Sequence, residues 1–305
     1  MSLQALYDVP APAKLNLFLH VIGRRADGYH LLQSPFVLID WCDTLHFERR
    51  DDGRLQRHDL GPALPADDLC LRAARALQAA SRTTLGADIQ VDKQVPWGAG
   101  MGGGSSDAAS TLLALNRLWG LNWPRDRLLA IGLTLGADVP FFVGGQNAFV
   151  EGVGERLTPV RCKPQHYAVV KPAASLPTRL IFEHPLMVRD TEAATLVGSR
   201  DEAGLVDLPQ HWQDANGGTN WFGRNDLQAA AQACSAEVAQ AASWLDGHYG
   251  NSRMTGSGSA LFARAGTDDT PGSGLATFPT ADLPSGWVGR LCLGLVEHPL
   301  RRWAD

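Results

Sequence analysis

A glycine-rich segment at residues 95–110, VPWGAGMGGGSSDAAS, contains the residue types that best suit a phosphate-binding site. Glycine loses more conformational entropy on folding than other residues, so a cluster of glycines implies that something approaches the main chain closely. Apolar residues at helical spacing follow it, and the start of a helix offers free N–H groups and a positive dipole end to an anion. A long flexible connector is the alternative interpretation.

Two common phosphate-binding motifs do not fit this segment. Gly98–Gly103 reads GxGxxG, as in dinucleotide-binding proteins, but residues 89–95 before it alternate polar and apolar side chains instead of forming a continuously apolar strand. No acidic residue ends a second strand about 20 positions later. The segment also lacks the Gly-Lys-Ser/Thr of a P-loop. What remains is a third kind of phosphate cradle, in which glycines precede Ser105 and Ser106 at the start of a helix.

Three more polar residues stand in apolar surroundings. Lys14 and Asn16 share one face of a predicted strand in APAKLNLFL, and Asp138 lies in LTLGADVPFF. A carboxylate among apolar side chains is costly to ionise unless a cation pairs with it. Simpler interpretations are a solvated lysine at the start of a strand and an aspartate that caps or turns the chain before Pro140. Residues 255–260, TGSGSA, predict a turn before a strand.

The composition describes an ordinary globular protein and limits its partners. The chain has 305 residues, of which 45% are hydrophobic and 19% charged, and its net charge is −5. An acidic chain lacks the basic surface that non-specific binding to DNA or RNA needs, so a bound nucleotide is expected to be a small molecule. Five dispersed cysteines without a CxxC pair, and histidines without ligand spacing, predict neither disulfides nor a metal site.

The sequence predicts neither a signal peptide nor a membrane span. The N-terminus has no basic segment followed by an apolar one, and the most apolar stretch, residues 128–143, is interrupted by Gly132, Gly136, Asp138 and Pro140. We therefore expect a cytoplasmic protein that acts on a small molecule and has no membrane or nucleic-acid partner. The sequence leaves the oligomeric state open.

Strands occur in runs and do not alternate regularly with helices, which favours an α+β fold over a doubly wound parallel sheet. The predicted elements include a half-buried strand at 15–21, a helix capped by Asp67 or Asp68, helices over about 106–119 and from about 124, a strand at 166–171 and an alanine-rich helix over 226–246. Residues 198–220 predict irregular structure. We expect a domain boundary near residue 160.

Several segments together resemble the GHMP small-molecule kinases in order and spacing. They are PAPAKLNLFLHV followed by RRADGYH, VPWGAGMGGGSSDAA, LTLGADVPFFV and TGSGSALF, with SLPTRLIF at 175–182 and NDL at 225–227 as further likenesses. The resemblance spans nearly the whole chain. The glycine loop marks only the superfamily, whereas Lys-x-Asn with a downstream Asp-Gly-Tyr-His is specific to a branch whose substrate is a sugar alcohol carrying cytidine diphosphate.

The resemblance implies a two-domain α+β fold. Residues 1–160 would form an ATP-binding domain like part of a ribosomal protein, and residues 161–305 a ferredoxin-like, substrate-binding domain. It also implies ATP on the glycine loop, a cytidine diphosphate sugar alcohol opposite, and phosphoryl transfer between them. Mg²⁺ is implied by that chemistry, with ligands that the sequence does not identify.

Family residues are carried over position by position. Lys14 and Asp138 match the catalytic pair. The residues that match substrate contacts are Asn16 near the reacting polyol, Tyr29 and Phe182 on the faces of cytosine, His30 at its edge, and Thr178. The residues that match the ATP site are Lys93, Pro96, Gly98, Gly100, Gly102, Gly103, Gly104, Ser105, Ser106 and Asp107.

Two positions depart from the family pattern. Asp68 stands where relatives often have Asn near adenine, and a carboxylate only accepts hydrogen bonds whereas an amide also donates them. That change puts the adenine contact in doubt. Asp107 replaces a frequent Asn after the glycines, at a predicted first-turn position where the helix dipole favours an acidic residue.

The resemblance assigns roles to the catalytic pair. Asp138 would accept the proton of the attacking hydroxyl, Lys14 would keep Asp138 ionised and offset phosphoryl charge, and loop N–H groups would hold the triphosphate. Three alternatives stay open. A GHMP kinase for homoserine or a mevalonate-type substrate should lack the Tyr29, His30 and Phe182 set. A dehydrogenase would use GxGxxG, and a non-catalytic relative should lack the Lys/Asp pair.

Overall fold

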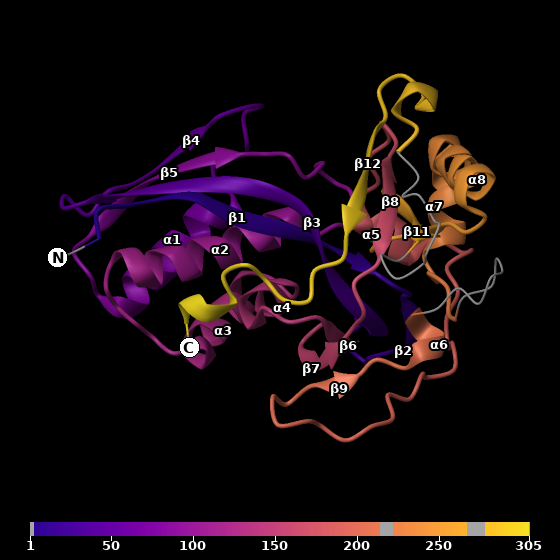
Figure 1. Ribbon diagram of the computed structural model, residues 1–305, viewed down its shortest axis with the longest axis horizontal. Coiled ribbons are helices and arrows are strands. Elements are labelled where there is room, and N and C mark those ends of the chain that lie inside the picture. The colour runs from indigo at the N-terminus through magenta and orange to yellow at the C-terminus, as the bar shows by residue number, and fades with distance from the viewer. Residues whose placement is uncertain (1–2, 214–221, 267–277, 305) are drawn as a thin grey trace.

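Eight strands form the larger of two β-sheets (Figure 1). The computed structural model describes residues 3–213, 222–266 and 278–304. The strands are β1 (Ala5–Asn16), β2 (His20–Arg24), β3 (His30–Arg50), β4 (Leu55–Asp59), β5 (Gly86–Asp92), β6 (Ala148–Gly152), β7 (Arg156–Arg161) and β9 (Val206–Asp207). Their main path is β4-β5-β3-β6-β7-β9, and β1 and β2 both pair antiparallel with the long strand β3.

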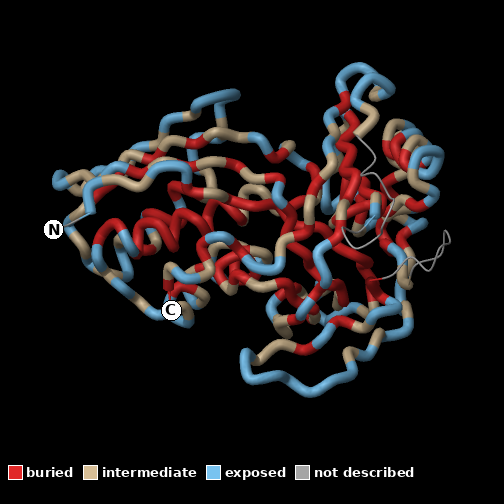
Figure 2. The backbone as a smooth tube through the Cα atoms, viewed as in Figure 1, coloured by how far each residue is buried: buried red, intermediate tan, exposed pale blue. Residues whose placement is uncertain are grey.

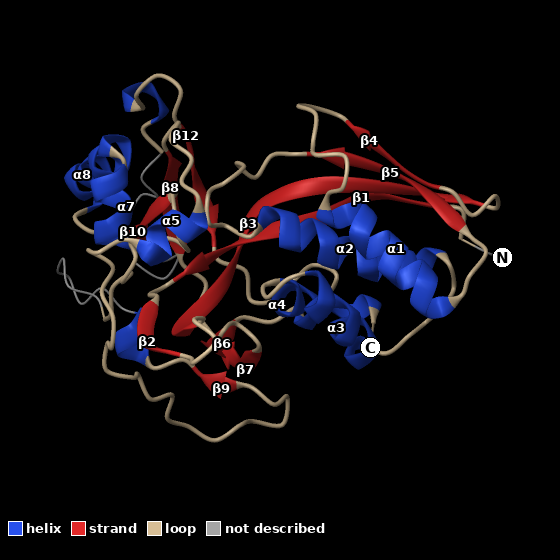
Figure 3. Cartoon of the chain, turned by 180° about the vertical axis from the view of Figure 1, so that it is seen from behind, coloured by secondary structure: helices blue, strands red, loops and turns tan. Residues whose placement is uncertain are grey.

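Four helices lie on one side of this sheet (Figure 3). They are α1 (Leu69–Ser81), α2 (Gly103–Leu118), α3 (Arg125–Leu135) and α4 (Val139–Gly144). α2 packs against β1 and β3, and its Leu112 and Leu115 share a core with Leu38, Leu45 and Phe47 of β3. Burying each such side chain contributes roughly 1.5–3 kcal/mol. Figure 2 shows the resulting buried layer between helices and sheet.

The second sheet is antiparallel, with the order β10-β11-β8-β12. Its strands are β8 (His166–Lys171), β10 (Arg253–Met254), β11 (Leu261–Gly266) and β12 (Val288–Leu293). The later helices along the chain are α5 (Thr178–Glu183), α6 (Gln210–Gln213), α7 (Gln228–Cys234), α8 (Ala236–Tyr249) and the 3-10 turn η1 (Thr280–Asp282), whereas the last 3-10 turn, η2 (Arg301–Trp303), contacts α2. α8 packs on β8 and β11. Among the helices in the described ranges, none combines the length and apolarity that a membrane crossing needs.

Segments after residue 160 contribute to both sheets. β8 begins the second sheet at His166, but β9 pairs with β7 of the first sheet. The C-terminal Leu300 and Ala304 are buried in the core of the first sheet, and the Arg125 amide donates to the Ala304 carbonyl at 3.1 Å. A division of the chain at residue 160 therefore stays a prediction.

The segment 15–21 is not the single half-buried strand that its alternation predicted. β1 ends and β2 begins within it, and the adjacent Leu17 and Phe18, between the two strands, are both fully buried. The Leu19 amide donates to the Arg224 carbonyl. Chain from the second half of the protein therefore covers the face that the alternation assigned to water.

The predicted alanine-rich helix over 226–246 is two helices. Ser235 takes an extended conformation (φ −149°, ψ 118°) that ends α7 and begins α8. Residues 198–220 contain the short β9 and α6, although irregular structure was expected, and residues 214–220 lie outside the described part. Periodicity could not find these breaks, because alanine continues on both sides of Ser235.

The helix predicted from Ser106 begins earlier, at Gly103. Gly102 directly before it has φ +73°, a conformation that favours glycine. Asp107 therefore lies in the second turn of α2. The argument that the helix dipole favours an acidic residue there was wrong, because the dipole acts mainly on the first turn.

Candidate active site

The glycine loop lies between the two halves of the protein, with its carbonyl groups turned into the structure. The carbonyl oxygens of Gly98 and Ala99 accept hydrogen bonds from two amides of the 255–260 turn, both at 3.2 Å. The Met101 carbonyl accepts from the Lys14 amide at 3.0 Å. Both halves of the chain therefore fix the loop.

Most amides of the same loop are free. Within the described residues, the backbone N–H groups of Gly98 and of Gly100 to Ser105 make no hydrogen bond, while that of Ala99 closes a turn at residues 97–98. Gly98, Gly100 and Gly102 all have positive φ, between 63° and 73°. Successive free amides at the start of a long helix form a concave donor surface that suits phosphate. This arrangement favours a phosphate cradle over the flexible connector.

Gly102 is glycine because there is no room for a side chain. A Cβ atom there would lie 2.9 Å from the Phe142 ring and 3.4 Å from Lys14 Cγ. The main chain of the loop thus contacts the side chain that carries the Lys14 ammonium. The glycine loop and the predicted catalytic lysine form one site.

Lys14 and Asp138 come together at that site. Lys14 Nζ lies 4.0 Å from Asp138 Oδ2, with side chains 4% and 33% exposed. Burial lowers the pKa of Lys14, and the charge of Asp138 opposes that change. Asp138 stands just before α4, but its side chain makes no capping hydrogen bond. The simpler interpretation proposed a helix cap, but the Asp138 carboxylate does not cap α4.

Asn16 bonds the lysine of this pair. Its Oδ1 accepts from Lys14 Nζ at 2.6 Å, from the Thr255 hydroxyl at 3.0 Å and from the Gly256 amide at 2.8 Å. Its Nδ2 donates to the Ser34 hydroxyl at 2.8 Å. Because protein groups occupy both ends of this buried amide, Asn16 is suited to hold Lys14 in place. Its predicted contact with substrate stays a prediction.

All the predicted catalytic and substrate-binding residues line one cavity of about 910 Å³. Its walls also include parts of the glycine loop and of the 255–260 turn. The predicted members are Lys14, Asn16, Tyr29, His30, Gly100, Gly102, Asp138, Thr178 and Phe182. The other predicted ATP-site residues lie along the loop and the start of α2, outside the cavity wall.

The aromatic end of the cavity differs from the expected sandwich. His30 stacks on Phe182, with ring centroids 5.2 Å apart and an interplanar angle of 25°, while Tyr29 is 67% exposed. Burial lowers the pKa of His30, and the nearby Arg24 and Arg189 lower it further, so its imidazole is neutral near pH 7. The ligand contacts of these three side chains stay predictions.

Protein groups already engage two of the ATP-site residues that the family pattern singled out. Asp68 caps α1 by accepting from the Leu71 amide at 3.0 Å and pairs with Arg57 at 2.9 Å. Lys93 bonds two carboxylates, those of Asp43 and Asp107. Sequence reasoning missed Asp43, which gives no signal beyond one polar residue on a predicted strand.

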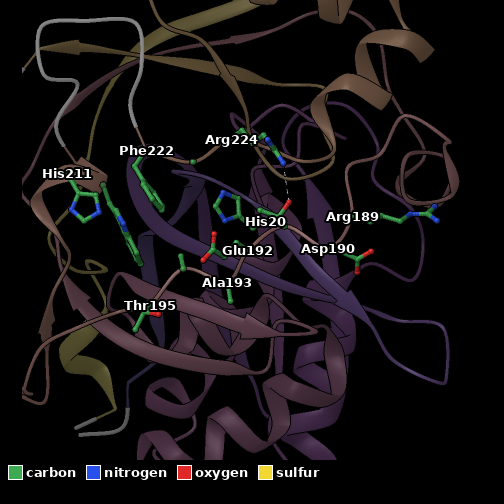
Figure 4. Close-up of a pocket in the computed structure, with 13 residues that line it drawn as sticks. His20, Arg189, Asp190, Glu192, Ala193, Thr195, His211, Phe222 and Arg224 are labelled. Carbon is green, nitrogen blue, oxygen red and sulfur yellow. Dashed lines mark hydrogen bonds between the residues drawn. The ribbon is translucent and has the colours of Figure 1, made fainter.

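Figure 4 shows a second cavity, of about 800 Å³, whose wall contains no residue of the glycine loop. His20, Phe222 and Arg224 are among the residues around it. It contains none of the predicted catalytic residues. Across the described ranges there is also no group of three or more histidine, cysteine or acidic side chains that could hold a metal ion.

Comparison with known proteins identifies the family. Residues 68–146 match the model of the GHMP kinases N terminal domain. The 4-diphosphocytidyl-2-C-methyl-D-erythritol kinase of Methylibium petroleiphilum is 65% identical over 304 residues, which cover 100% of both chains. The chain belongs to this kinase family. Its relative of the same name in Verminephrobacter eiseniae is 54% identical over 308 residues, 99% of each chain.

Solved structures agree with this family. A 4-(cytidine 5'-diphospho)-2C-methyl-D-erythritol kinase matches with a TM-score of 0.69 and 30% identity, over 94% of this chain and 98% of that one. A homoserine kinase from Cytophaga hutchinsonii (TM-score 0.61, 15% identical, 97% and 95% covered) shares the fold alone. The predicted GHMP kinase fold of the α+β class is confirmed. The homoserine, mevalonate and dehydrogenase alternatives are not favoured.

Proposed function

We propose that the protein is an ATP-dependent kinase that phosphorylates the 2-hydroxyl of 4-diphosphocytidyl-2-C-methyl-D-erythritol, a step of non-mevalonate isoprenoid precursor biosynthesis. One observation carries the proposal: a single cavity joins the Lys14 and Asp138 pair, the glycine loop at Gly102, and the Tyr29 and His30 wall. Its volume of about 910 Å³ suits a ligand of nucleotide size.

Asp138 is proposed as the general base. Its carboxylate lines the cavity, is one-third exposed and makes no capping hydrogen bond, so it is available to a substrate hydroxyl. Accepting the proton as the hydroxyl attacks phosphorus raises the nucleophilicity of the oxygen. Removing such a base costs about 10²–10⁴-fold in rate.

The positive charge of Lys14 is proposed to act on both the Asp138 carboxylate and the transferred phosphoryl group. Its buried ammonium lies 4.0 Å from the Asp138 carboxylate, so the two side chains can interact as a pair of opposite charges. A fixed positive charge in a poorly solvated site also stabilises the charge that spreads over phosphoryl oxygens in the transition state. Asn16 fixes the ammonium, since its Oδ1 accepts from Lys14 Nζ at 2.6 Å.

ATP is proposed to bind with its phosphates on the free amides between Gly98 and Ser105. Mg²⁺ usually keeps several waters and is held by one or two carboxylates and the substrate phosphates. The described residues offer no larger metal-binding cluster, which is compatible with an ion that enters with the nucleotide. Such an ion would neutralise phosphate charge.

The cytidine end of the substrate is proposed to bind among Tyr29, His30, Phe182 and Thr178. Two aromatic rings and a neutral imidazole offer stacking surface and a hydrogen-bonding edge. The Thr178 hydroxyl lies 2.9 Å from that of Ser257, at the cavity wall. We further propose residues 1–160 as the ATP-binding domain, residues 161–305 as the substrate-binding domain, and a cytoplasmic location, which fits an enzyme that consumes ATP.

A coupled ADP-release assay on the full chain tests the proposal. The acceptor panel is 4-diphosphocytidyl-2-C-methyl-D-erythritol, free methylerythritol, homoserine and mevalonate. We expect ADP release with the cytidine compound alone, and a phosphomonoester on its 2-hydroxyl by phosphorus NMR. Equal turnover of free methylerythritol, or preference for homoserine or mevalonate, would contradict the proposal.

A further inference from the structure

Three buried charged side chains form a cluster beneath the glycine loop, outside the cavity that holds the catalytic pair. The side chain of Asp43, on β3, is 0% exposed, that of Lys93 12% and that of Asp107 4%. The Lys93 ammonium bonds Asp107 Oδ2 at 2.6 Å and also bonds Asp43 Oδ2. Two carboxylates thus share one cation in a place where charge is costly to bury.

This cluster holds both ends of the glycine loop. Asp43 Oδ1 accepts the amides of Gln94 at 2.6 Å and Val95 at 2.7 Å, where the chain leaves β5 and enters the loop. Asp107 lies in the second turn of α2, just beyond the end of the loop. Because Lys93 bonds both carboxylates, one ion network connects the start of the loop to the second turn of the helix that follows it.

The Lys93 ammonium is committed to this network. A Cβ atom on Gly103 would lie 3.4 Å from Lys93 Nζ, so the cluster lies directly under the first residue of α2. Two carboxylates at bonding distance accept two of the three N–H donors of the ammonium. These bonds give Lys93 a role inside the protein, and its predicted ATP contact stays a prediction.

We propose that Asp43 and Asp107, acting through Lys93, are positioning residues that hold the loop amides in place for the phosphates of ATP. The inference rests on the proposed function, because it takes ATP as the ligand of the loop. It assigns Asp43 a role in nucleotide affinity and none in the proton transfer at Asp138.

The proposal predicts that ATP affinity depends on the protonation of Asp107. A purely structural role would not produce that dependence. Burial raises the pKa of Asp107 to about 8; Lys93 opposes the rise and Asp43 adds to it. From α1, the thiol of Cys70 also faces the cluster, and burial raises its pKa well above the usual range, so the thiol stays neutral. Above about pH 8 the cluster therefore gains a negative charge under the phosphate site.

Isothermal titration with ATP, and separately with CDP, tests the positioning role. We expect Asp43→Asn to weaken ATP binding at least about tenfold and to leave CDP binding within about twofold. Its kcat at saturating ATP should stay within about threefold of the wild type. The matched control is Asp88→Asn on β5, which breaks an ion pair with Arg50 of β3 away from the loop and should change neither affinity.

A pH series tests whether the ionisation of Asp107 weakens ATP binding. Between about pH 7.5 and about pH 9.5, ATP affinity should fall several-fold more in the wild type than in Asp107→Asn, which cannot ionise there. Unchanged ATP affinity in a folded Asp43→Asn, or the same pH response in both proteins, overturns the inference. If Asp43→Asn fails to fold, the pH comparison decides alone. Wild-type protein that does not bind ATP at all would instead refute the proposed function.

Discussion

The carboxylate of Asp138 and the ammonium of Lys14 lie 4.0 Å apart in the wall of the cavity of about 910 Å³. Lys14 comes from β1 and Asp138 from the residue before α4, so the pair forms only when the helices pack on the sheet. The local structure does not use the Asp138 side chain as a cap, which leaves it free for chemistry.

Replacing Lys14 should lower the activity of the protein without lowering its stability. Lys14→Met removes a buried ammonium whose pKa burial has lowered, and it fills the same space with an apolar chain. We expect kcat to fall at least about 10²-fold while Tm stays the same or rises, because burying charge costs stability. Thermal unfolding and steady-state kinetics check this. A fall in Tm with little change in kcat would make Lys14 a structural residue.

A side chain at Gly102 should disrupt nucleotide binding. In Gly102→Ala the new Cβ would meet Phe142 and Lys14 at a residue with φ +73°. We expect ATP affinity to fall at least about tenfold, with CDP affinity and circular dichroism little changed. The control is Gly247→Ala in α8, where a Cβ meets nothing within 4 Å. Normal ATP binding by Gly102→Ala would return the loop to the connector interpretation.

Tyr29 and His30 should affect cytidine recognition differently. Stacking contributes about 1–3 kcal/mol per base and does not distinguish cytosine from uracil. Tyr29→Ala should therefore weaken CDP and UDP binding alike, whereas His30→Ala should mainly reduce the preference for CDP. Titration of each variant with both nucleotides measures this. A Tyr29→Ala protein that loses only its preference for CDP would reverse the two roles.

The stability difference between the wild type and Asp107→Asn should depend on pH in a defined direction. The pKa of Asp107 is about 8 in the folded protein and about 4 in an unfolded chain. Between these values the folded state keeps a proton that the unfolded state has lost, so wild-type stability falls as pH rises from about 4 to about 8. The Tm advantage of Asp107→Asn should therefore grow from about pH 5 to about pH 8. A constant difference would mean that Asp107 is ionised throughout.

Local sequence signals located most of the predicted site. Glycines before a helix start, a lysine and an asparagine on one strand face, and an aspartate in an apolar run are all visible within short windows. The structure brings Lys14, Asn16 and Asp138 to one cavity. Their placement follows from local chain geometry together with the packing of α4 and β1.

Other features depend on partners that are distant in the chain. Asp43 and Lys93 are 50 residues apart. The residues around Asp43 therefore do not predict that its carboxylate bonds the glycine loop. The alternation at 15–21 predicted one exposed face, but residues near Arg224 cover it. The break at Ser235 likewise lies in a run of good helix formers. Such contacts are set by tertiary packing, which short windows do not contain.

Turnover by Asp138→Asn is the most direct measurement of the proposed chemistry. The change is nearly isosteric, so packing should survive while the proton acceptor is lost. We expect kcat to fall at least about 10²-fold with ATP affinity little changed, and the double variant with Lys14→Met to be scarcely slower than either single variant. Turnover by Asp138→Asn within about fivefold of the wild type would contradict the account.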